Sequence, residues 1–139
     1  MPFGIINYKK FNPFVRPTKE EQQLKEEYIT KLYNLKKPHN KIVLDNLKDF
    51  YLTHDCIDKF GKKYEIKSVN HQYGKFMGEY LSIFKLGQCN CKGLRIIYHY
   101  LNDDIYYIDY SATAFKQKWF KNSNKAGMVY IPIEALKKA

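Results

Sequence analysis

Apolar and polar positions alternate most clearly along the chain between Gly78 and Ala114. Three runs in this segment are dominated by aromatic and β-branched residues, which fit the pleated, half-buried surface of a sheet: Glu79 to Leu86, Leu94 to Leu101 and Ile105 to Thr113. The polar segment 102–104 separates the last two runs, and its short side chains tolerate turn dihedrals. The pattern predicts a three-stranded antiparallel meander.

A helical spacing precedes this sheet. Thr18 and Glu21 have the form of a capping box, in which the two side chains satisfy backbone N–H groups at the start of a helix. Apolar residues then recur at helical intervals up to Pro38, which ends the helix: Leu24, Tyr28, Leu32 and Leu35. Asn40 is a suitable cap for a second helix, Lys41 to Leu52. Together they predict an N-terminal α-hairpin that covers one face of the sheet.

The remaining segments carry weaker patterns. We expect an edge strand over residues 3–8, a helical turn over 55–60, short strands over 63–69 and 129–131, and a helix over 132–138. The expected fold class is α+β, a small antiparallel sheet with a C-terminal three-stranded meander, covered by the α-hairpin. Residues 1–139 are expected to form a single domain with an enlarged middle segment (53–77) and a basic C-terminal tail (115–139).

The charge of the chain bears on its function more than on its fold. The 24 Lys and Arg residues exceed the 14 Asp and Glu residues, so the formal net charge is +10, and Arg16 and Arg95 are the only arginines. Such an excess favours polyanionic partners, although a lysine-rich, solvated surface is the plainer explanation. The sequence has no long apolar run or basic amphipathic helix, which favours nucleic acid over membrane.

Two further features of composition bear on location and on the core. The three cysteines form no even framework, and the N-terminal residues lack the apolar core of a secretory signal, so a reducing cytoplasm is expected. The 13 tyrosines can fill a core or stack on bases. Phosphate-binding glycine loops, a Gly-x-Ser-x-Gly elbow and a His-Glu-x-x-His motif are missing from the sequence, so no cofactor is expected.

The strand residues also resemble a known family. Glu-Tyr-Leu-x-Ile-x-Lys-Leu from Glu79, a glycine-bearing turn, Leu-Arg-Ile-Ile-Tyr from Leu94, an Asp-Asp turn and a last apolar strand follow in order. This succession is similar to the sheet of RelE/ParE-superfamily toxins, including the HigB-like branch. The similarity covers residues 1–118 in order of elements and residues 80–114 in residue pattern.

The resemblance implies a RelE-like fold and a toxin of a toxin–antitoxin system that cleaves mRNA on the ribosome. Family members hold the scissile phosphate with basic side chains, support attack by the 2′-hydroxyl and protonate the leaving oxygen. Carried over by position, the basic and proton-transferring residues would be Lys85, Arg95, Lys116 or Lys118, and Tyr130. No arginine follows the last strand, and lysine lacks the bidentate fork of arginine. Solvated or salt-bridged strand residues are the alternative for Lys85 and Arg95.

Histidine, aromatic and cysteine residues add candidates. Side chains alternate along a strand, so Arg95, Ile97 and His99 should share a face, and His99 is the candidate for acid–base chemistry. A basic and aromatic segment offers phosphate contacts and base stacking, or packing back onto the sheet, through Trp119, Phe120, Lys121 and Lys125. A zinc site from His54, Cys56, Cys89 and Cys91 is possible on paper, but Cys-x-Cys lacks the usual spacer, and three reduced cysteines are expected instead.

These patterns leave three functions open. The first is an mRNA endonuclease acting on the ribosome and neutralised by an acidic antitoxin protein. The second is a ParE-like inhibitor of DNA gyrase that works by protein contact. The third is a non-catalytic phage or mobile-element protein that binds nucleic acid or an acidic host protein.

Overall fold

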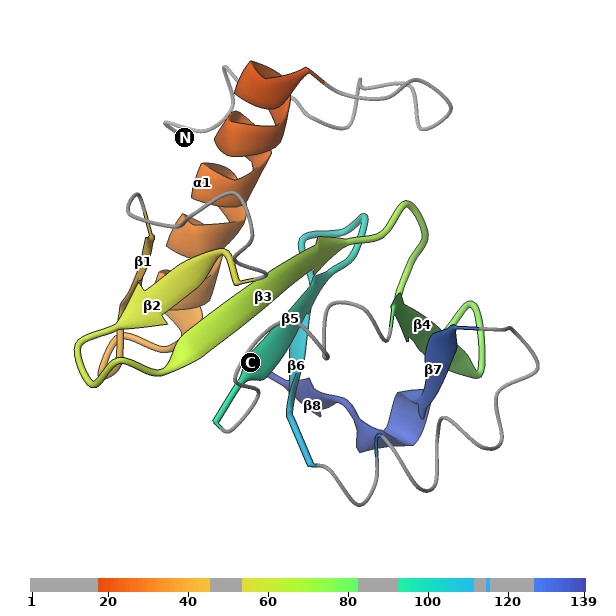
Figure 1. The fold of residues 1–139 in the computed structure, drawn as a ribbon. Helices are drawn as coiled ribbons and strands as arrows, with labels where there is room; N and C mark the ends of the chain where they lie inside the picture. The colour runs from red at the N-terminus through yellow and green to blue at the C-terminus, as the bar shows by residue number, and fades with distance from the viewer. Residues whose placement is uncertain (1–17, 46–53, 83–92, 112–114, 116–126) are drawn as a thin grey trace.

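The computed structural model describes residues 18–45, 54–82, 93–111, 115 and 127–139 (Figure 1). The one α-helix in these residues is α1, Lys19–Lys36. Its N-cap is Thr18, whose hydroxyl oxygen accepts a hydrogen bond of 3.1 Å from the Glu21 amide, so the predicted start is confirmed. The helix ends at Lys36, before Pro38, as predicted.

The buried face of α1 differs from the predicted stripe. Leu24 and Leu35 are 37% and 73% exposed, whereas Tyr28, Ile29 and Tyr33 are buried. The aromatic rings therefore set which face of the helix packs on the sheet, and two of the four predicted leucine and tyrosine positions lie towards solvent.

Strands form two sheets. The larger sheet is mixed and has the order β1-β2-β3-β5-β6-β8, in which only the β3–β5 pair is parallel. Its strands are β1 (Ile42–Leu44), β2 (Cys56–Asp58), β3 (Lys63–Ser68), β5 (Arg95–His99), β6 (Ile105–Asp109) and β8 (Lys137–Lys138). The smaller sheet pairs β4 (Gly78–Ser82) with β7 (Met128–Pro132) in antiparallel fashion, and a 3-10 turn, η4 (Ile133–Ala135), joins β7 to β8.

The predicted fold class is wrong. In place of the second helix of an α-hairpin, Ile42–Leu44 form the edge strand β1, and residues 46–53 lie outside the described part of the chain. A short apolar run fits a helix or a strand equally well by periodicity. The Asn34 side chain favours the strand, because its amide both accepts from the Ile42 N–H and donates to the Ile42 carbonyl oxygen, at 2.8 Å each.

The predicted meander is wrong for a different reason. The β5–β6 hairpin forms as predicted, but β4 pairs with β7, and the neighbour of β5 on its other side is the parallel strand β3. Residues 56–58 form β2 instead of a helical turn, and residues 137–138 form β8 instead of the end of a helix. The short strands predicted over 63–69 and 129–131 are confirmed as β3 and β7. Alternation identifies strands, but it does not select their partners.

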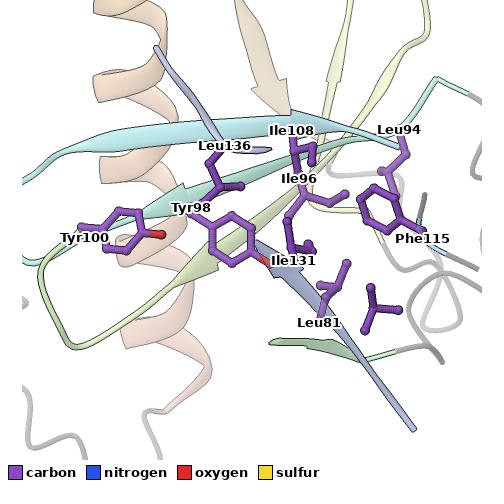
Figure 2. Close-up of a cluster of buried hydrophobic side chains, with 10 residues drawn as sticks. Leu81, Leu94, Ile96, Tyr98, Tyr100, Ile108, Phe115, Ile131 and Leu136 are labelled. Carbon is purple, nitrogen blue, oxygen red and sulfur yellow. The ribbon is translucent and has the colours of Figure 1, made fainter. Parts of the chain in front are cut away.

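Two hydrophobic clusters lie on opposite faces of the large sheet. The first is covered by α1, and its central side chains include Tyr33, Tyr64 and Ile97. The second lies between the large sheet and the β4–β7 pair (Figure 2) and contains Leu81, Ile96, Tyr98, Phe115 and Ile131. Within the described residues, no helix is long and apolar enough to cross a membrane.

Candidate functional site

Arg95 lies at the start of β5 on the face covered by α1, and it is held by side chains from two elements, α1 and β6. Its Nε and Nη2 donate to the two carboxylate oxygens of Asp109, at 2.7 and 3.0 Å. Its Nη1 donates to the Tyr33 hydroxyl at 2.9 Å, and its guanidinium carbon lies 4.0 Å from the centre of the Tyr107 ring. The hairpin register sets this pair, because Arg95 and Asp109 are cross-strand partners.

The ion pair stabilises both charges. Burial disfavours the charged form of Arg95, but the hydrogen bonds and charge of Asp109 outweigh burial and raise the pKa of Arg95. Burial likewise raises the pKa of Asp109, while the hydrogen bond and charge of Arg95, together with the Lys62 ammonium, lower it on balance. The fork of Arg95, which the resemblance assigns to a scissile phosphate, is thus occupied by a carboxylate.

Lysines surround this pair. Lys62 Nζ lies 3.2 Å from Asp109 Oδ1, and Lys37 Nζ lies 5.1 Å from the centre of the Tyr107 ring. The exposed Lys137 is the cross-strand partner of Tyr107, and directly paired residues share a face. We call the residues around Tyr107 and Asp109 the basic surface: Lys37, Lys62, Arg95, Tyr107, Asp109 and Lys137. Four cations and one carboxylate give it a formal charge of +3.

His99 shares the face of Arg95 and Ile97, as predicted, but it is 1% exposed. Its Nε2 lies 2.9 Å from Asp103 Oδ1, its Nδ1 lies 3.4 Å from the Ser68 hydroxyl, and Tyr28 donates to the second Asp103 oxygen at 2.7 Å. Four strand steps place His99 about 13 Å from Arg95 along β5. The structure therefore does not bring the two side chains together, and the contacts of His99 are those of a buried polar network.

Tyr130, the predicted late tyrosine, lies on β7 in the small sheet. Its ring packs edge-on against the Tyr80 ring, with centres 4.9 Å apart. Its neighbours Val129 and Ile131 point into the second cluster, so Tyr130 faces away from that cluster and is not brought to Arg95. The other predicted functional residues of the sheet and tail lie outside the described residues: Lys85, Lys116, Lys118, Trp119, Phe120, Lys121 and Lys125.

Half of the possible zinc set can be located. His54 is buried, with Nε2 2.6 Å from Asp45 Oδ2, and the buried Cys56 thiol lies 3.4 Å from the Thr30 hydroxyl. Cys89 and Cys91 lie outside the described residues. In the part of the chain that the structure describes, no three His, Cys, Asp or Glu side chains are grouped to hold a metal ion.

A second polar cluster, on the other face of the sheet, was not predicted. The buried Glu79 carboxylate accepts from the Tyr100 hydroxyl at 2.9 Å and lies 3.0 Å from His71 Nε2. Burial, followed by the charges of Glu79 and Glu65, raises the pKa of the fully buried Tyr98 hydroxyl. Alternation places Glu79 on the same face of β4 as Leu81, which is buried in the second cluster, but the charge of Glu79 favours a solvated position at the sequence level. The cluster stabilises the contact between the two sheets.

Sequence reasoning found Arg95 but missed its surroundings. Asp109 is the only acidic residue between Ile105 and Thr113, so a correct hairpin register would have identified the ion pair. Lys37, Lys62 and Lys137 come from segments far apart in the sequence, and no local signal marks them as neighbours. Scans against models of protein families and against curated proteins found no match to this chain.

Proposed function

We propose that the protein is a non-catalytic binder of nucleic acid, and that the basic surface contacts the phosphate backbone. The observation that carries this proposal is the placement of four cations around Tyr107 and Asp109, the one carboxylate among the residues that define the surface. Lys37 and Arg95 lie over the Tyr107 ring, Lys62 contacts Asp109, and Lys137 is the cross-strand partner of Tyr107. The formal net charge of +10 supports it, because a polyanion releases counterions when cations replace them.

The chemistry of the surface favours backbone contacts over base reading. Lysines are point charges that neutralise phosphates without regard to sequence. Arg95 lies 4.0 Å from the Tyr107 ring centre and Lys37 lies 5.1 Å from it, so cations already occupy positions at this ring. Stacking of a base on Tyr107 is therefore disfavoured, and binding should depend strongly on salt and weakly on sequence.

Cleavage of mRNA remains a prediction that the resemblance implies. The engagement of Arg95 with Asp109 and the burial of His99 weigh against catalysis by these two residues. Expression in bacteria would test the prediction directly: growth arrest with new in-frame mRNA ends would support a ribosome-dependent nuclease. Arrest with accumulation of gyrase-cleaved DNA would instead support the ParE-like alternative.

Fluorescence anisotropy with a short labelled single-stranded RNA tests the binding proposal. We expect the double change Lys37→Gln and Lys137→Gln to weaken binding at least about tenfold at low salt. The slope of log affinity against log salt should become shallower by about 1.4, since each lost phosphate contact on a single strand removes about 0.7.

The matched control removes two lysines elsewhere. Lys19 and Lys75 are both exposed, at the start of α1 and in the loop before β4. The double change Lys19→Gln and Lys75→Gln reduces the net charge equally, and we expect it to weaken binding much less. Equal losses in the two double variants would show that net charge, and not this surface, governs binding.

A further inference from the structure

The contact between Arg95 and Asp109 has the geometry by which a protein binds phosphate. A guanidinium recognises a carboxylate and a phosphate through the same pair of parallel N–H donors. Both carboxylate oxygens of Asp109 accept from Arg95, and Oδ1 also lies 3.2 Å from Lys62 Nζ. A fork of arginine with a lysine on the same oxygen is a set of donors that an oxyanion of nucleic acid would fit.

Other side chains hold Arg95 independently of Asp109. The Tyr33 hydroxyl accepts from Nη1, and Tyr33 itself is 1% exposed and fixed in the core beneath α1. The ring of Tyr107, on β6, lies against the guanidinium of Arg95. The arginine therefore keeps its position when Asp109 moves away, so that a competing anion would find the fork already oriented.

Asp109 is the more exposed partner of the ion pair. Its side chain is 47% exposed, compared with 18% for Arg95, and it lies at the end of β6. Water and salt screen a carboxylate this exposed, so the ion pair is weaker than a buried pair of the same bidentate geometry. Rotation of the Asp109 side chain would open the arginine fork without a change in the sheet.

We propose that Asp109 is an internal substitute for a phosphate group, and that a nucleic-acid phosphate displaces it from Arg95 and Lys62 on binding. This inference rests on the proposed function of the basic surface. The apparent affinity for phosphate then equals the affinity of the open fork multiplied by the fraction of molecules in which the fork is open. Anions that bind too weakly to displace Asp109 are excluded.

The test compares two variants that each raise the net charge by one. Asp109→Asn removes the competing charge, whereas Glu134→Gln removes an exposed charge in η4, beside Tyr73 and the second cluster. In anisotropy titrations with single-stranded RNA, we expect Asp109→Asn to tighten binding about tenfold and to steepen the salt slope by about 0.7, equivalent to one further phosphate contact. Glu134→Gln should tighten binding less than about twofold, because its charge is screened from the basic surface.

A third variant locates the gain. In the Asp109→Asn background, Arg95→Lys should abolish the tenfold gain, because lysine lacks the fork. Asp109→Ser serves as a second neutral replacement, and thermal unfolding confirms that each variant is folded. If the wild type binds RNA and Asp109→Asn and Glu134→Gln change its affinity equally, the displacement of Asp109 is overturned and the binding proposal stands. Failure of the wild type and both variants to bind would overturn both.

Discussion

The two ends of strand β5 place similar side chains in opposite environments. Arg95 and His99 share one face of the strand, and each has an aspartate partner. Tyr33 of α1 accepts directly from Arg95, whereas Tyr28 of α1 donates to Asp103, the partner of His99. At the Arg95 end, cations outnumber carboxylates and Asp109 is half exposed. At the His99 end, the histidine is buried and its polar contacts are made within the fold. Exposure and charge balance, not residue type, distinguish the basic surface from the buried network around His99.

The difference follows from where α1 covers the sheet. Tyr28 lies against His99, with ring centres 6.2 Å apart, and it closes that end of the strand. Five residues later, Tyr33 contacts Arg95, and α1 ends at Lys36, near Tyr107 and the basic surface. The helix therefore seals one end of β5 and contributes Lys37 to the other.

Replacement of His99 by alanine should give the largest loss of stability. The change leaves a cavity and removes the partner of Asp103 and of the Ser68 hydroxyl, so we expect a loss of about 2–4 kcal/mol in the free energy of unfolding. Urea unfolding followed by circular dichroism measures it, with the exposed His39→Ala as the control. RNA affinity of the folded variant should be unchanged. Weaker RNA binding by folded His99→Ala would break the comparison, because it would give the His99 end a role in binding.

Asp58 organises the hairpin that carries Lys62. Its carboxylate accepts from the Tyr64 hydroxyl at 2.8 Å, from the Asn40 amide at 3.1 Å, and from the backbone N–H groups of Phe60 and Lys62 at 2.9 and 3.0 Å. Asp58→Ala leaves these donors without their acceptor, and we expect a loss of about 1–3 kcal/mol. Glu134→Gln, which removes an exposed carboxylate, is the control for chemical denaturation.

The same residue predicts a dependence on pH. Burial alone raises the pKa of Asp58, but its hydrogen bonds outweigh burial and lower the pKa below the ordinary value of 3.8. The ionised carboxylate therefore stabilises the fold fully above the pKa of the unfolded chain, and this contribution is lost as the pH falls through the lower folded value. The stability difference between wild type and Asp58→Ala should be constant above about pH 5 and shrink below pH 3.8. A constant difference down to strong acid would exclude this ionisation as the cause.

Local patterns predicted the first helix and the β5–β6 hairpin, but they assigned helix to residues that form β1, β2 and β8, and they did not predict long-range pairing. Thr18 and Pro38 bounded the helix, and alternation located the β5–β6 hairpin and placed Arg95 and His99 on one face. The β4–β7 pair joins segments about 50 residues apart, and the parallel β3–β5 contact brackets β4 in sequence. The spacing of side chains along a strand predicts neither pairing. A strand is stabilised by its neighbours in the sheet, and the sequence of the strand does not identify those neighbours.

The basic surface, like the fold, was predictable in its local features but not in its long-range contacts. Arg95 stood out as one of two arginines, but its exposure depends on where α1 ends, and its partner depends on the hairpin register. Lys37 and Lys137 reach Tyr107 from a helix cap and from the last strand, which only the folded chain brings together. The burial of His99 could not be predicted, because the sequence places Tyr28 on the helix but does not indicate that its ring lies against His99.

The variants with the smallest expected effects on stability distinguish the Arg95 end of β5 from the His99 end most directly. Tyr28→Phe and Tyr33→Phe each remove one hydroxyl from α1, so they are matched controls for each other. Tyr28 donates to Asp103 at 2.7 Å, and Tyr33 accepts from Arg95 at 2.9 Å. Because Asp103 and Arg95 are partly exposed and water can replace the lost partner, each change should cost only about 1 kcal/mol, or about 3 °C in Tm.

Their effects on binding should differ. Without the Tyr33 hydroxyl, Arg95 is less firmly oriented, so Tyr33→Phe should weaken RNA binding about two- to threefold, whereas Tyr28→Phe should leave it unchanged. Thermal unfolding and anisotropy on the same samples give both quantities. If Tyr28→Phe weakened RNA binding as much as Tyr33→Phe, the two ends of β5 would be coupled through α1, and the helix would transmit changes between them instead of separating them.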